Sequence, residues 1–234
     1  MKVDFHSHIL PGIDDGARTL EESVQLVSEM AGWGFERITC TPHITRKFRN
    51  TREVIQEKFD ILHNALVEKG LDIDIRMSAE YRLDPETWPA LLEKGDLMPI
   101  EDRFILMEFP INDPSEMGDL DPLDEFRKVI ALGLTPILPH PERYFYLSHD
   151  KLLSYVDAGV KIQSNYGSLA GIYGSEAQAA AQSLIDEGIV SFLASDMHNM
   201  SYIRAIGAWL QEGHSLWEYC LIEGSSCIPD QSEG

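Results

Sequence analysis

The sequence predicts an α/β fold of parallel strands and covering helices, of the (β/α) barrel type. Short apolar runs alternate with amphipathic segments along the whole chain, which is the pattern of strands covered by helices. The length of 234 residues is one at which an α/β barrel commonly forms one domain. No Ser/Gly-rich linker or change of composition marks a boundary. We therefore expect one domain over residues 1–234, ending in a short polar tail at about 223–234.

About seven strands are expected from apolar runs of strand length that are followed by loops. They fall near residues 2–5, 36–40, 73–79, 104–108, 135–139, 160–164 and 190–195.

Two of the intervening helices carry start signals. Thr19 and Glu22 have the spacing of a capping box, and an apolar face follows before the glycines of residues 32–34 end the helix. Asn50 and Glu53 repeat the capping spacing at the start of a second helix that ends near Gly70. The buried stripe of this second helix is expected to consist of Ile55, Phe59, Leu62 and Leu66.

Composition and charge argue against several classes of partner. The formal net charge of −20 argues against nucleic acid or anionic lipid, which bind through lysine and arginine. No apolar run approaches the ~18 to 20 residues of a membrane span, and no apolar secretory signal is present. Three cysteines without a CxxC pair indicate neither a disulfide framework nor a zinc ribbon. We expect a cytoplasmic protein without membrane insertion.

Metal-binding side chains recur where the predicted strands give way to loops. In a parallel barrel these strand ends converge on one face, where catalytic groups collect. Residues i and i+2 of an extended segment point the same way, so His6 and His8 can reach one metal ion. Asp196 and His198 repeat this spacing. The residues expected on this face are His6, His8, His43, Glu80, Glu108, His140, Asp196 and His198.

Imidazole and carboxylate ligands together suit divalent ions such as manganese, iron or zinc. Each of these residues taken alone is also explained by a hydrogen-bonded core or loop position. Eight of them at the ends of six strands exceed what packing requires, and exceed what one ion can use. The pattern therefore indicates a centre of two or three metals, which generates hydroxide near neutral pH and clamps an in-line displacement at phosphorus.

Four further residues lie close in sequence to these ligands. Asp14 and Asp15 are adjacent, so they cannot easily share one metal, and the residues alone leave open which of them is a ligand and which caps the loop. Arg143 and Arg204 follow two of the ligands, and a planar guanidinium can bind phosphate oxygens at two points. A surface or helix salt bridge is the alternative for both arginines.

The order of several strings gives a family resemblance over nearly the whole chain. "DFHSHILPGIDDG", "TPH", "SAE", "MEF", "HPERY" and "ASDMHN" together resemble the polymerase and histidinol phosphatase (PHP) superfamily. Within it, the chain is most similar to the manganese-dependent bacterial tyrosine-protein phosphatases of capsule and exopolysaccharide operons. "HILPGIDDG" and "ASDMHN" are specific to that branch, whereas generic members share only the HxH, the central acid and the terminal DxH.

The resemblance implies a distorted seven-stranded barrel of PHP type, with three metal ions, usually manganese, at its C-terminal face; iron and zinc are alternatives. It favours Asp15 over Asp14, because related proteins place the ligand directly before the glycine, here Gly16. Arg143 matches a phosphate-binding arginine, and Arg204 matches a second one when one inserted residue is allowed. The implied metal ligands are His6, His8, Asp15, His43, Glu80, Glu108, His140, Asp196 and His198.

The implied reaction is hydrolysis of phosphotyrosine in a protein by attack of a metal-bound hydroxide. The implied partner is a bacterial tyrosine autokinase that controls polysaccharide synthesis. Two other functions are alternatives. One is a phosphoesterase that acts on a small molecule such as histidinol phosphate or a nucleotide, and the other is a non-catalytic, metal-stabilised binding domain.

The stretch "CTPHITR", from Cys40 to Arg46, matches the Cx5R spacing of cysteine-dependent tyrosine phosphatases. Such a loop wraps its backbone amides around a phosphate and usually needs glycine to do so. Here Pro42 lacks an amide hydrogen, and His43 belongs to the expected metal set. We therefore expect that Cys40 is not a nucleophile.

Overall fold

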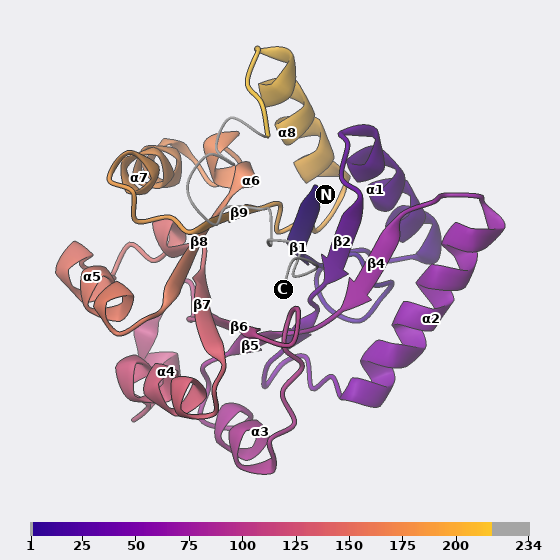
Figure 1. The fold of residues 1–234 in the computed structure, drawn as a ribbon. Helices are drawn as coiled ribbons and strands as arrows, with labels where there is room; N and C mark the ends of the chain where they lie inside the picture. The colour runs from indigo at the N-terminus through magenta and orange to yellow at the C-terminus, as the bar shows by residue number, and fades with distance from the viewer. Residues whose placement is uncertain (1, 217–234) are drawn as a thin grey trace, which may run out of the picture.

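Strands and helices alternate along the chain, and the strands lie around a common centre with the helices outside them (Figure 1). The computed structural model describes residues 2–216. The predicted polar tail at about 223–234 lies outside the described residues, as do Cys220 and Cys227. Within residues 2–216, no helix is both long and apolar enough to cross a membrane.

The strands form two sheets in which every neighbouring pair is parallel. The first sheet has the order β1 (Val3–Ser7), β2 (Arg37–Cys40) and β4 (Asp74–Met77). The second has the order β3 (His43–Ile44), β5 (Glu80–Arg82), β6 (Phe104–Glu108), β7 (Thr135–Pro139), β8 (Lys161–Asn165) and β9 (Phe192–Ala194). Seven of these strands lie close to the positions predicted from the sequence, and β3 and β5 are short additions.

The two added strands explain why the described residues form two sheets rather than one. Two residues separate the end of β2 from the start of β3, and two separate the end of β4 from the start of β5. Pro42, which lacks a donor, lies at the first break, and its carbonyl accepts a hydrogen bond from the Glu80 amide across the gap (3.1 Å). A short new strand thus begins after each of these breaks. β3 starts at His43 and pairs with β5, which starts at Glu80 and pairs in turn with β6.

The first and last strands meet through their carboxyl ends. The Asp196 amide donates to the His6 carbonyl (2.9 Å), and the His8 amide donates to the Met197 carbonyl (2.8 Å). The buried Asp4 carboxylate adds a side-chain connection, because it accepts hydrogen bonds from the Ser195 amide (2.8 Å) and the Ser195 hydroxyl (2.6 Å). The amino-terminal strand is therefore fixed directly to the last strand of the second sheet.

The helices cover the outside of the strands. The longer ones are α1 (Leu20–Gly32), α2 (Arg52–Glu68), α4 (Pro122–Ala131), α5 (His149–Asp157), α7 (Ser175–Asp186) and α8 (Met200–Gln211). Shorter helical segments are α3 (Trp88–Lys94), η1 (Pro114–Met117), η2 (Pro141–Arg143) and α6 (Tyr166–Leu169).

The helix caps agree with the sequence at one helix and differ at the other. Thr19 is the N-cap of α1, as predicted, and its side chain accepts from the Glu22 amide. The N-cap of α2 is Thr51, so the prediction of Asn50 was wrong by one residue. Asn50 instead donates from its side-chain amide to the carbonyls of His43 (2.8 Å) and Ile13 (3.1 Å). It therefore ties the loop after β3 to the loop after β1.

A small apolar cluster lies among the strands, separate from the larger core that the helices help to form. Its members are Val3, Phe5, Ile100, Phe104, Leu106, Ile137, Phe192 and Ala194. In β6, Phe104, Leu106 and Glu108 point to the same side, since side chains alternate along a strand. The side chains of this strand thus change from apolar to acidic toward its carboxyl end, where the polar site begins.

We expect Asp4→Ala to lower the free energy of unfolding by about 2–3 kcal/mol, because the buried amide and hydroxyl of Ser195 would lose their acceptor. Urea denaturation would measure this loss. A matched control is Asp60→Ala, since Asp60 accepts a single exposed hydrogen bond from Gln56. The control should cost less than about 0.5 kcal/mol. Equal losses for the two variants would contradict the structural role of Asp4.

Candidate metal centre

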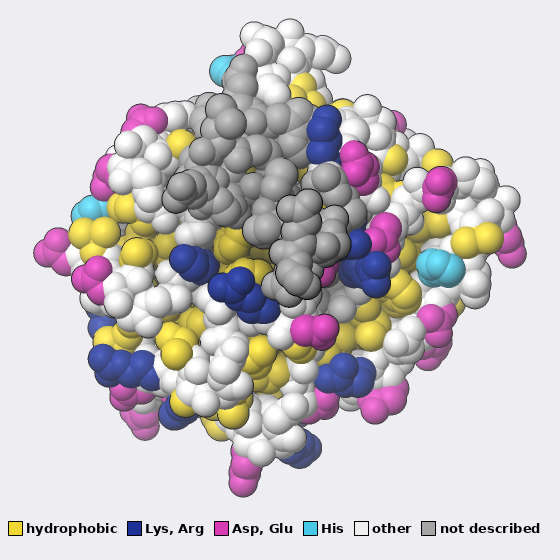
Figure 2. All heavy atoms as spheres, in the orientation of Figure 1, with side chains coloured by type: hydrophobic (Ala, Val, Ile, Leu, Met, Phe, Trp, Pro, Cys, Tyr) yellow, Lys and Arg dark blue, Asp and Glu magenta, His cyan; other side chains and the backbone are white. Residues whose placement is uncertain are grey.

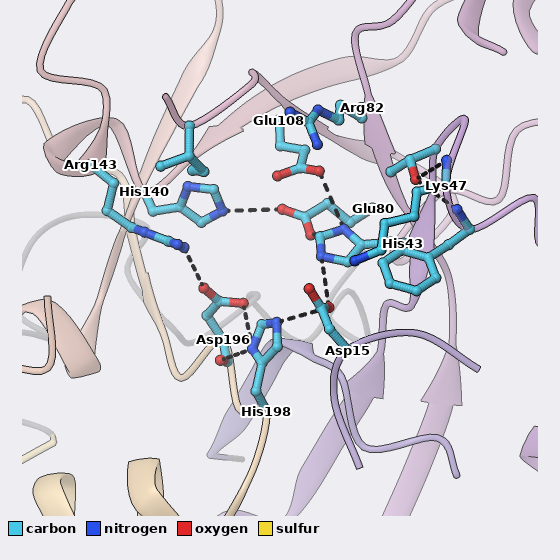
Figure 3. Close-up of a pocket in the computed structure, with 13 residues that line it drawn as sticks. Asp15, His43, Lys47, Glu80, Arg82, Glu108, His140, Arg143, Asp196 and His198 are labelled. Carbon is cyan, nitrogen blue, oxygen red and sulfur yellow. Dashed lines mark hydrogen bonds and ion pairs between the residues drawn. The ribbon is translucent and has the colours of Figure 1, made fainter. Parts of the chain in front are cut away.

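The structure brings together all nine residues that the sequence predicts as metal ligands. Figure 3 shows seven of them, and His6 and His8 are not drawn there. Their ligand atoms fall into four groups, and within each group these atoms lie within 4.8 Å of one another. The four groups are His8, Asp15, His43 and His198; His6, His8 and Asp196; His6, Glu80 and His140; and His43, Glu80 and Glu108. Because several residues belong to two groups, the groups form one continuous cluster.

The cluster lies at the carboxyl ends of the parallel strands, as expected from the sequence. His6 is on β1 and Glu108 is on β6. His140 directly follows β7, and Asp196 lies two residues after the end of β9. His140 and Asp196 have positive φ angles of 41° and 49°. Residues other than glycine seldom adopt this left-handed backbone conformation, and such strain is concentrated at functional sites.

Glu80 lies at the middle of the cluster. Its carboxylate oxygens are 3.2 Å from His8 Nε2, 3.0 Å from His43 Nδ1 and 3.2 Å from His140 Nε2. A fourth distance, to His6 Nε2, is 3.4 Å. Burial alone would raise the pKa of Glu80, but the facing imidazoles of His6 and His43 outweigh it and hold that pKa well below its usual value. Glu80 is thus a buried carboxylate in its ionised form.

Asp196 is the second buried carboxylate with several histidine neighbours. Its Oδ1 lies 3.3 Å from the Nε2 atoms of both His6 and His8. Its Oδ2 accepts hydrogen bonds from Asn165 Nδ2 (2.7 Å) and Arg143 Nη1 (3.3 Å). The two oxygens therefore have different surroundings, one facing imidazoles and the other facing donors from the chain.

Acceptors other than the clustered ligand atoms determine which nitrogen of three histidines carries the proton. His6 Nδ1 lies 2.7 Å from Gln163 Oε1, and His8 Nδ1 lies 2.9 Å from Asp14 Oδ2. His198 Nδ1 lies 2.8 Å from the backbone carbonyl of Asp196. Since each acceptor requires a protonated Nδ1, the Nε2 lone pairs point into the cluster, which is how histidines ligate metals.

The adjacent aspartates that the sequence left open have different positions. Asp14 is buried, and besides His8 it accepts from the amides of Gly16 (2.9 Å) and His43 (3.1 Å). Burial raises the pKa of Asp14, but the neighbouring His8 more than offsets it and brings the pKa down to about 2. Asp15 Oδ1 instead lies 3.4 Å from His43 Nε2 and 3.6 Å from His198 Nε2. Asp15 thus faces the cluster, and Asp14 orients His8.

The loop that carries both aspartates approaches His8 very closely at Gly16. A Cβ atom on Gly16 would lie 1.9 Å from the His8 carbonyl oxygen and 2.5 Å from the His8 Cβ. No rotamer change can relieve a clash with backbone. The glycine that follows the two aspartates is therefore required for the loop to fold back over His8.

The donor set fits divalent cations. Glu80 Oε2 and Asp196 Oδ1 are buried and have no hydrogen-bond partner within the described part of the chain, and the same is true of His140 Nδ1. Ionised oxygens are costly to bury without a donor or a cation. Mixed imidazole and carboxylate ligands are those that manganese, iron and zinc accept.

A pocket of about 150 Å³ opens onto the cluster, and Arg143 lines it. The guanidinium of Arg143 is 4.2 Å from the ring centroid of Tyr173, besides its contact with Asp196. Arg204, the other arginine predicted from the sequence, is exposed on α8 and is not among the residues that line this pocket. The structure thus brings Arg143, and not Arg204, to the cluster.

Sequence reasoning missed the other residues that line the pocket, which are Thr45, Lys47, Phe48, Arg82 and Ile111. Arg82 lies two residues after Glu80 on β5, so the alternation of side chains could have indicated it. Lys47 and Phe48 lie in the loop after β3, where no periodic signal exists.

The model of a protein family described as "Capsular polysaccharide synthesis, CpsB/CapC" matches residues 2–205. The chain belongs to this family. Membership in the CpsB/CapC family confirms the resemblance seen in the sequence.

Two relatives and two solved structures show the extent of the similarity. Tyrosine-protein phosphatase YwqE of Bacillus subtilis is 29% identical over 201 residues, covering 85% of this chain and 78% of YwqE. Tyrosine-protein phosphatase CpsB of Streptococcus pneumoniae is 30% identical over 211 residues, covering 85% of this chain and 83% of CpsB.

A solved structure from work on YwqE and CpsB, described as unique metal-dependent tyrosine phosphatases, matches with a TM-score of 0.78 and 27% identity. It covers 90% of this chain and 86% of that structure. The phosphotriesterase homology protein of Escherichia coli matches with a TM-score of 0.56 at 13% identity, covering 95% of both chains, and shows similarity of fold alone.

We expect Mn²⁺ to stabilise protein that has been freed of metal with a chelator. At about 100 times the dissociation constant, binding adds about 2.7 kcal/mol, which corresponds to a rise in melting temperature of roughly 5–10 °C. Thermal denaturation during a Mn²⁺ titration would measure the rise. Glu80→Ala should remove most of it, whereas Glu86→Ala, which removes a carboxylate paired with Arg49 at the surface, should keep it. An undiminished rise in Glu80→Ala would exclude Glu80 as a ligand.

Proposed function

We propose that this chain is a metal-dependent protein-tyrosine phosphatase that acts in the synthesis of capsule or exopolysaccharide. Its substrate is phosphotyrosine in a protein, and its reaction is hydrolysis of the phosphate monoester. The observation that carries the proposal is a cluster of nine histidine and carboxylate side chains, seven of which line one pocket together with Arg143, in a chain of the CpsB/CapC family. The relatives named as tyrosine-protein phosphatases support it.

We propose that the centre holds three divalent ions, most favourably Mn²⁺, with Fe or Zn as alternatives. The proposed ligands are the nine clustered residues, His6, His8, Asp15, His43, Glu80, Glu108, His140, Asp196 and His198. Glu80 belongs to two of the four groups, as do His6, His8 and His43, which supports ions that share ligands. Bound ions of this kind supply Lewis-acid stabilisation of negative charge and make water nucleophilic near neutral pH.

The side chains around the pocket suit a phosphorylated phenol. Arg143 offers a planar fork for two phosphate oxygens, and its contacts with Asp196 and Tyr173 hold it in place. Phe48 and Ile111 provide apolar surface for an aromatic ring. Phenolate leaves readily, with a pKa of ~10, so the pocket does not need a strong general acid. Arg204 has no contact with this pocket, and a role in phosphate binding stays a prediction for it.

The proposal extends to the partner and the architecture. A bacterial tyrosine autokinase is the proposed source of the phosphotyrosine, because the family is named for capsular polysaccharide synthesis.

We also propose that the two sheets are parts of one distorted seven-stranded barrel within a single domain. Two observations support this. Breaks of two residues separate β2 from β3 and β4 from β5, and backbone hydrogen bonds join the Asp196 amide to the His6 carbonyl and the His8 amide to the Met197 carbonyl.

Two other functions compete with this proposal. One is hydrolysis of a small phosphate ester such as histidinol phosphate, and the other is binding of a partner by a metal-stabilised domain without catalysis. Metal analysis of protein purified without chelator, followed by turnover of a phosphotyrosine peptide and of histidinol phosphate as each metal is restored, separates the three. Preferred turnover of the phosphopeptide supports the proposal. Preferred turnover of histidinol phosphate, or no turnover of any ester with the metals bound, would refute it.

We expect Arg143→Ala to lower kcat/KM on a phosphotyrosine peptide by about 10²–10³-fold, because a positioned donor to the transferring phosphoryl group is lost. Arg143→Lys should recover only part of this activity, since an ammonium cannot bind two oxygens in the same plane. The control is Arg127→Ala, which removes an exposed arginine paired with Asp124 on α4. If Arg127→Ala lowers kcat/KM as much as Arg143→Ala does, the loss reflects the change in net charge and not a contact between Arg143 and the phosphate.

Cys40 should not contribute chemically to turnover. It is buried in β2, and burial raises the pKa of its thiol, with the charges of Asp4 and Asp14 adding to the effect. The thiolate needed for attack on phosphorus is therefore disfavoured. We expect Cys40→Ala to keep most of the activity of the folded enzyme and His43→Ala to lose at least ~100-fold. Circular dichroism would confirm folding of both. A loss of activity in Cys40→Ala as large as that in His43→Ala would favour a cysteine-dependent mechanism.

A further inference from the structure

The loop after β3 and the first residue of α2 carry an unusual concentration of positive charge. Residues 46–52 contain Arg46, Lys47, Arg49 and Arg52, in a chain with 19 basic and 39 acidic residues. Figure 2 shows acidic side chains mostly around the outer part of the face that it displays, with several lysine and arginine side chains nearer its centre. In a chain so rich in acid, a cation without an acidic partner is unusual.

The three arginines of this segment form ion pairs and Lys47 does not. Arg46 pairs with Glu116, Arg49 with Glu86 (2.9 Å) and Arg52 with Asp96 (3.2 Å). No carboxylate within residues 2–216 forms an ion pair with Lys47, although acidic residues outnumber basic ones two to one. Lys47 is also the member of this basic set that lines the pocket (Figure 3).

Local hydrogen bonds hold Lys47 in this position. The buried Thr45 hydroxyl accepts from the amides of Lys47 (3.1 Å) and Phe48 (2.9 Å), and the Thr45 amide donates to the Phe48 carbonyl (3.0 Å). The ammonium of Lys47 lies 4.5 Å from the centroid of the Phe48 ring, which in turn is nearly parallel to the His43 ring (7°, centroids 6.0 Å apart). The loop is thus an ordered turn that presents a cation beside an aromatic surface.

We propose that Lys47 is a specificity-determining residue that binds an anionic group of the substrate adjacent to the phosphotyrosine. The inference rests on the proposed function. Arg143 and seven of the clustered residues line the pocket in which the phosphate is expected, and Lys47 is an exposed residue of the loop after β3 that lines the same pocket. The Phe48 ring contacts both the Lys47 ammonium and the His43 ring, so a phosphotyrosine ring that packs near Phe48 brings the residues that flank it toward the ammonium. A flanking carboxylate and a second phosphotyrosine both supply such an anion.

The experiment uses the whole chain loaded with Mn²⁺ and three phosphotyrosine peptides of equal length. The peptides carry a glutamate, a second phosphotyrosine or a glutamine next to the cleaved residue. We expect a preference in kcat/KM of about tenfold for the anionic peptides over the glutamine peptide, the size of one well-placed charge contact. A preference for either anionic peptide alone would support the contact and name its source. No preference for either would overturn it.

Substitutions assign the preference to Lys47. Lys47→Met should reduce the ratio between anionic and neutral peptides to about one, Lys47→Glu should reverse it, and Lys47→Arg should keep it. Lys151→Met is the matched control, because the Lys151 ammonium also lies over an aromatic ring, 5.5 Å from the centroid of Tyr155 on α5, and does not line the pocket. A ratio unchanged by Lys47→Met would refute the proposal.

Binding separates this inference from the proposed reaction. Fluorescence anisotropy with the same peptides, carrying a non-hydrolysable phosphonate in place of the phosphate ester, measures the contact whether or not turnover occurs. If the unchanged chain does not hydrolyse phosphotyrosine but Lys47→Met binds the anionic peptides more weakly than it does, the proposed reaction is refuted and the contact is supported. If the unchanged chain hydrolyses phosphotyrosine but binds the anionic peptides no better than Lys47→Met does, the reaction is supported and the contact is refuted. Raising the salt concentration should weaken the preference, since Lys47 is exposed.

Discussion

Repulsion among buried carboxylates is the constraint on which the rest of this structure depends. Glu80, Glu108 and Asp196 lie close together at the carboxyl ends of the strands, and all three are at most 5% exposed. Like charges a few ångströms apart with little solvent are strongly unfavourable, so the arrangement is stable only where positive charge or donors are interleaved with them. Histidines from five positions lie between the acids, and the surrounding loops are folded so as to keep them there.

A second layer of residues fixes the directions of the first. Asp14 and Gln163 determine the protonated nitrogen of His8 and His6, and Asn165 satisfies the oxygen of Asp196 that faces away from the imidazoles. Such outer contacts commonly control metal affinity as much as the ligands do. The left-handed backbone at Asp196 is held by the same neighbourhood, because its amide is fixed to the β1 backbone. Orientation at this centre is therefore a property of the loops and strand ends together.

The sequence was sufficient for eight of the nine clustered residues because parallel strands bring their carboxyl ends together, whatever the details of the loops. The ninth, Asp15, lies in a loop, and only the family resemblance favoured it over Asp14. It was not sufficient where the outcome depends on single hydrogen bonds. Asn50 and Thr51 are both good cap residues, and only the carbonyls of His43 and Ile13 determine that Asn50 serves another purpose. The breaks after β2 and β4 follow from the pairing of β3 with β5 and of β5 with β6, which sequence periodicity does not reveal. Lys47 was missed because a loop has no period from which its direction can be inferred.

The junction of the first and last strands has a consequence for how the molecule is made. Asp4 and Ser195 are 191 positions apart, and residues from both ends of that interval contribute to the same centre. Contacts of such long range form late and slowly, because the intervening chain must be ordered first. During synthesis, a growing polypeptide holds His6 and His8 long before Asp196 and His198 leave the ribosome. The complete cluster of nine side chains can thus assemble only after residue 198 has been synthesised and has left the ribosome.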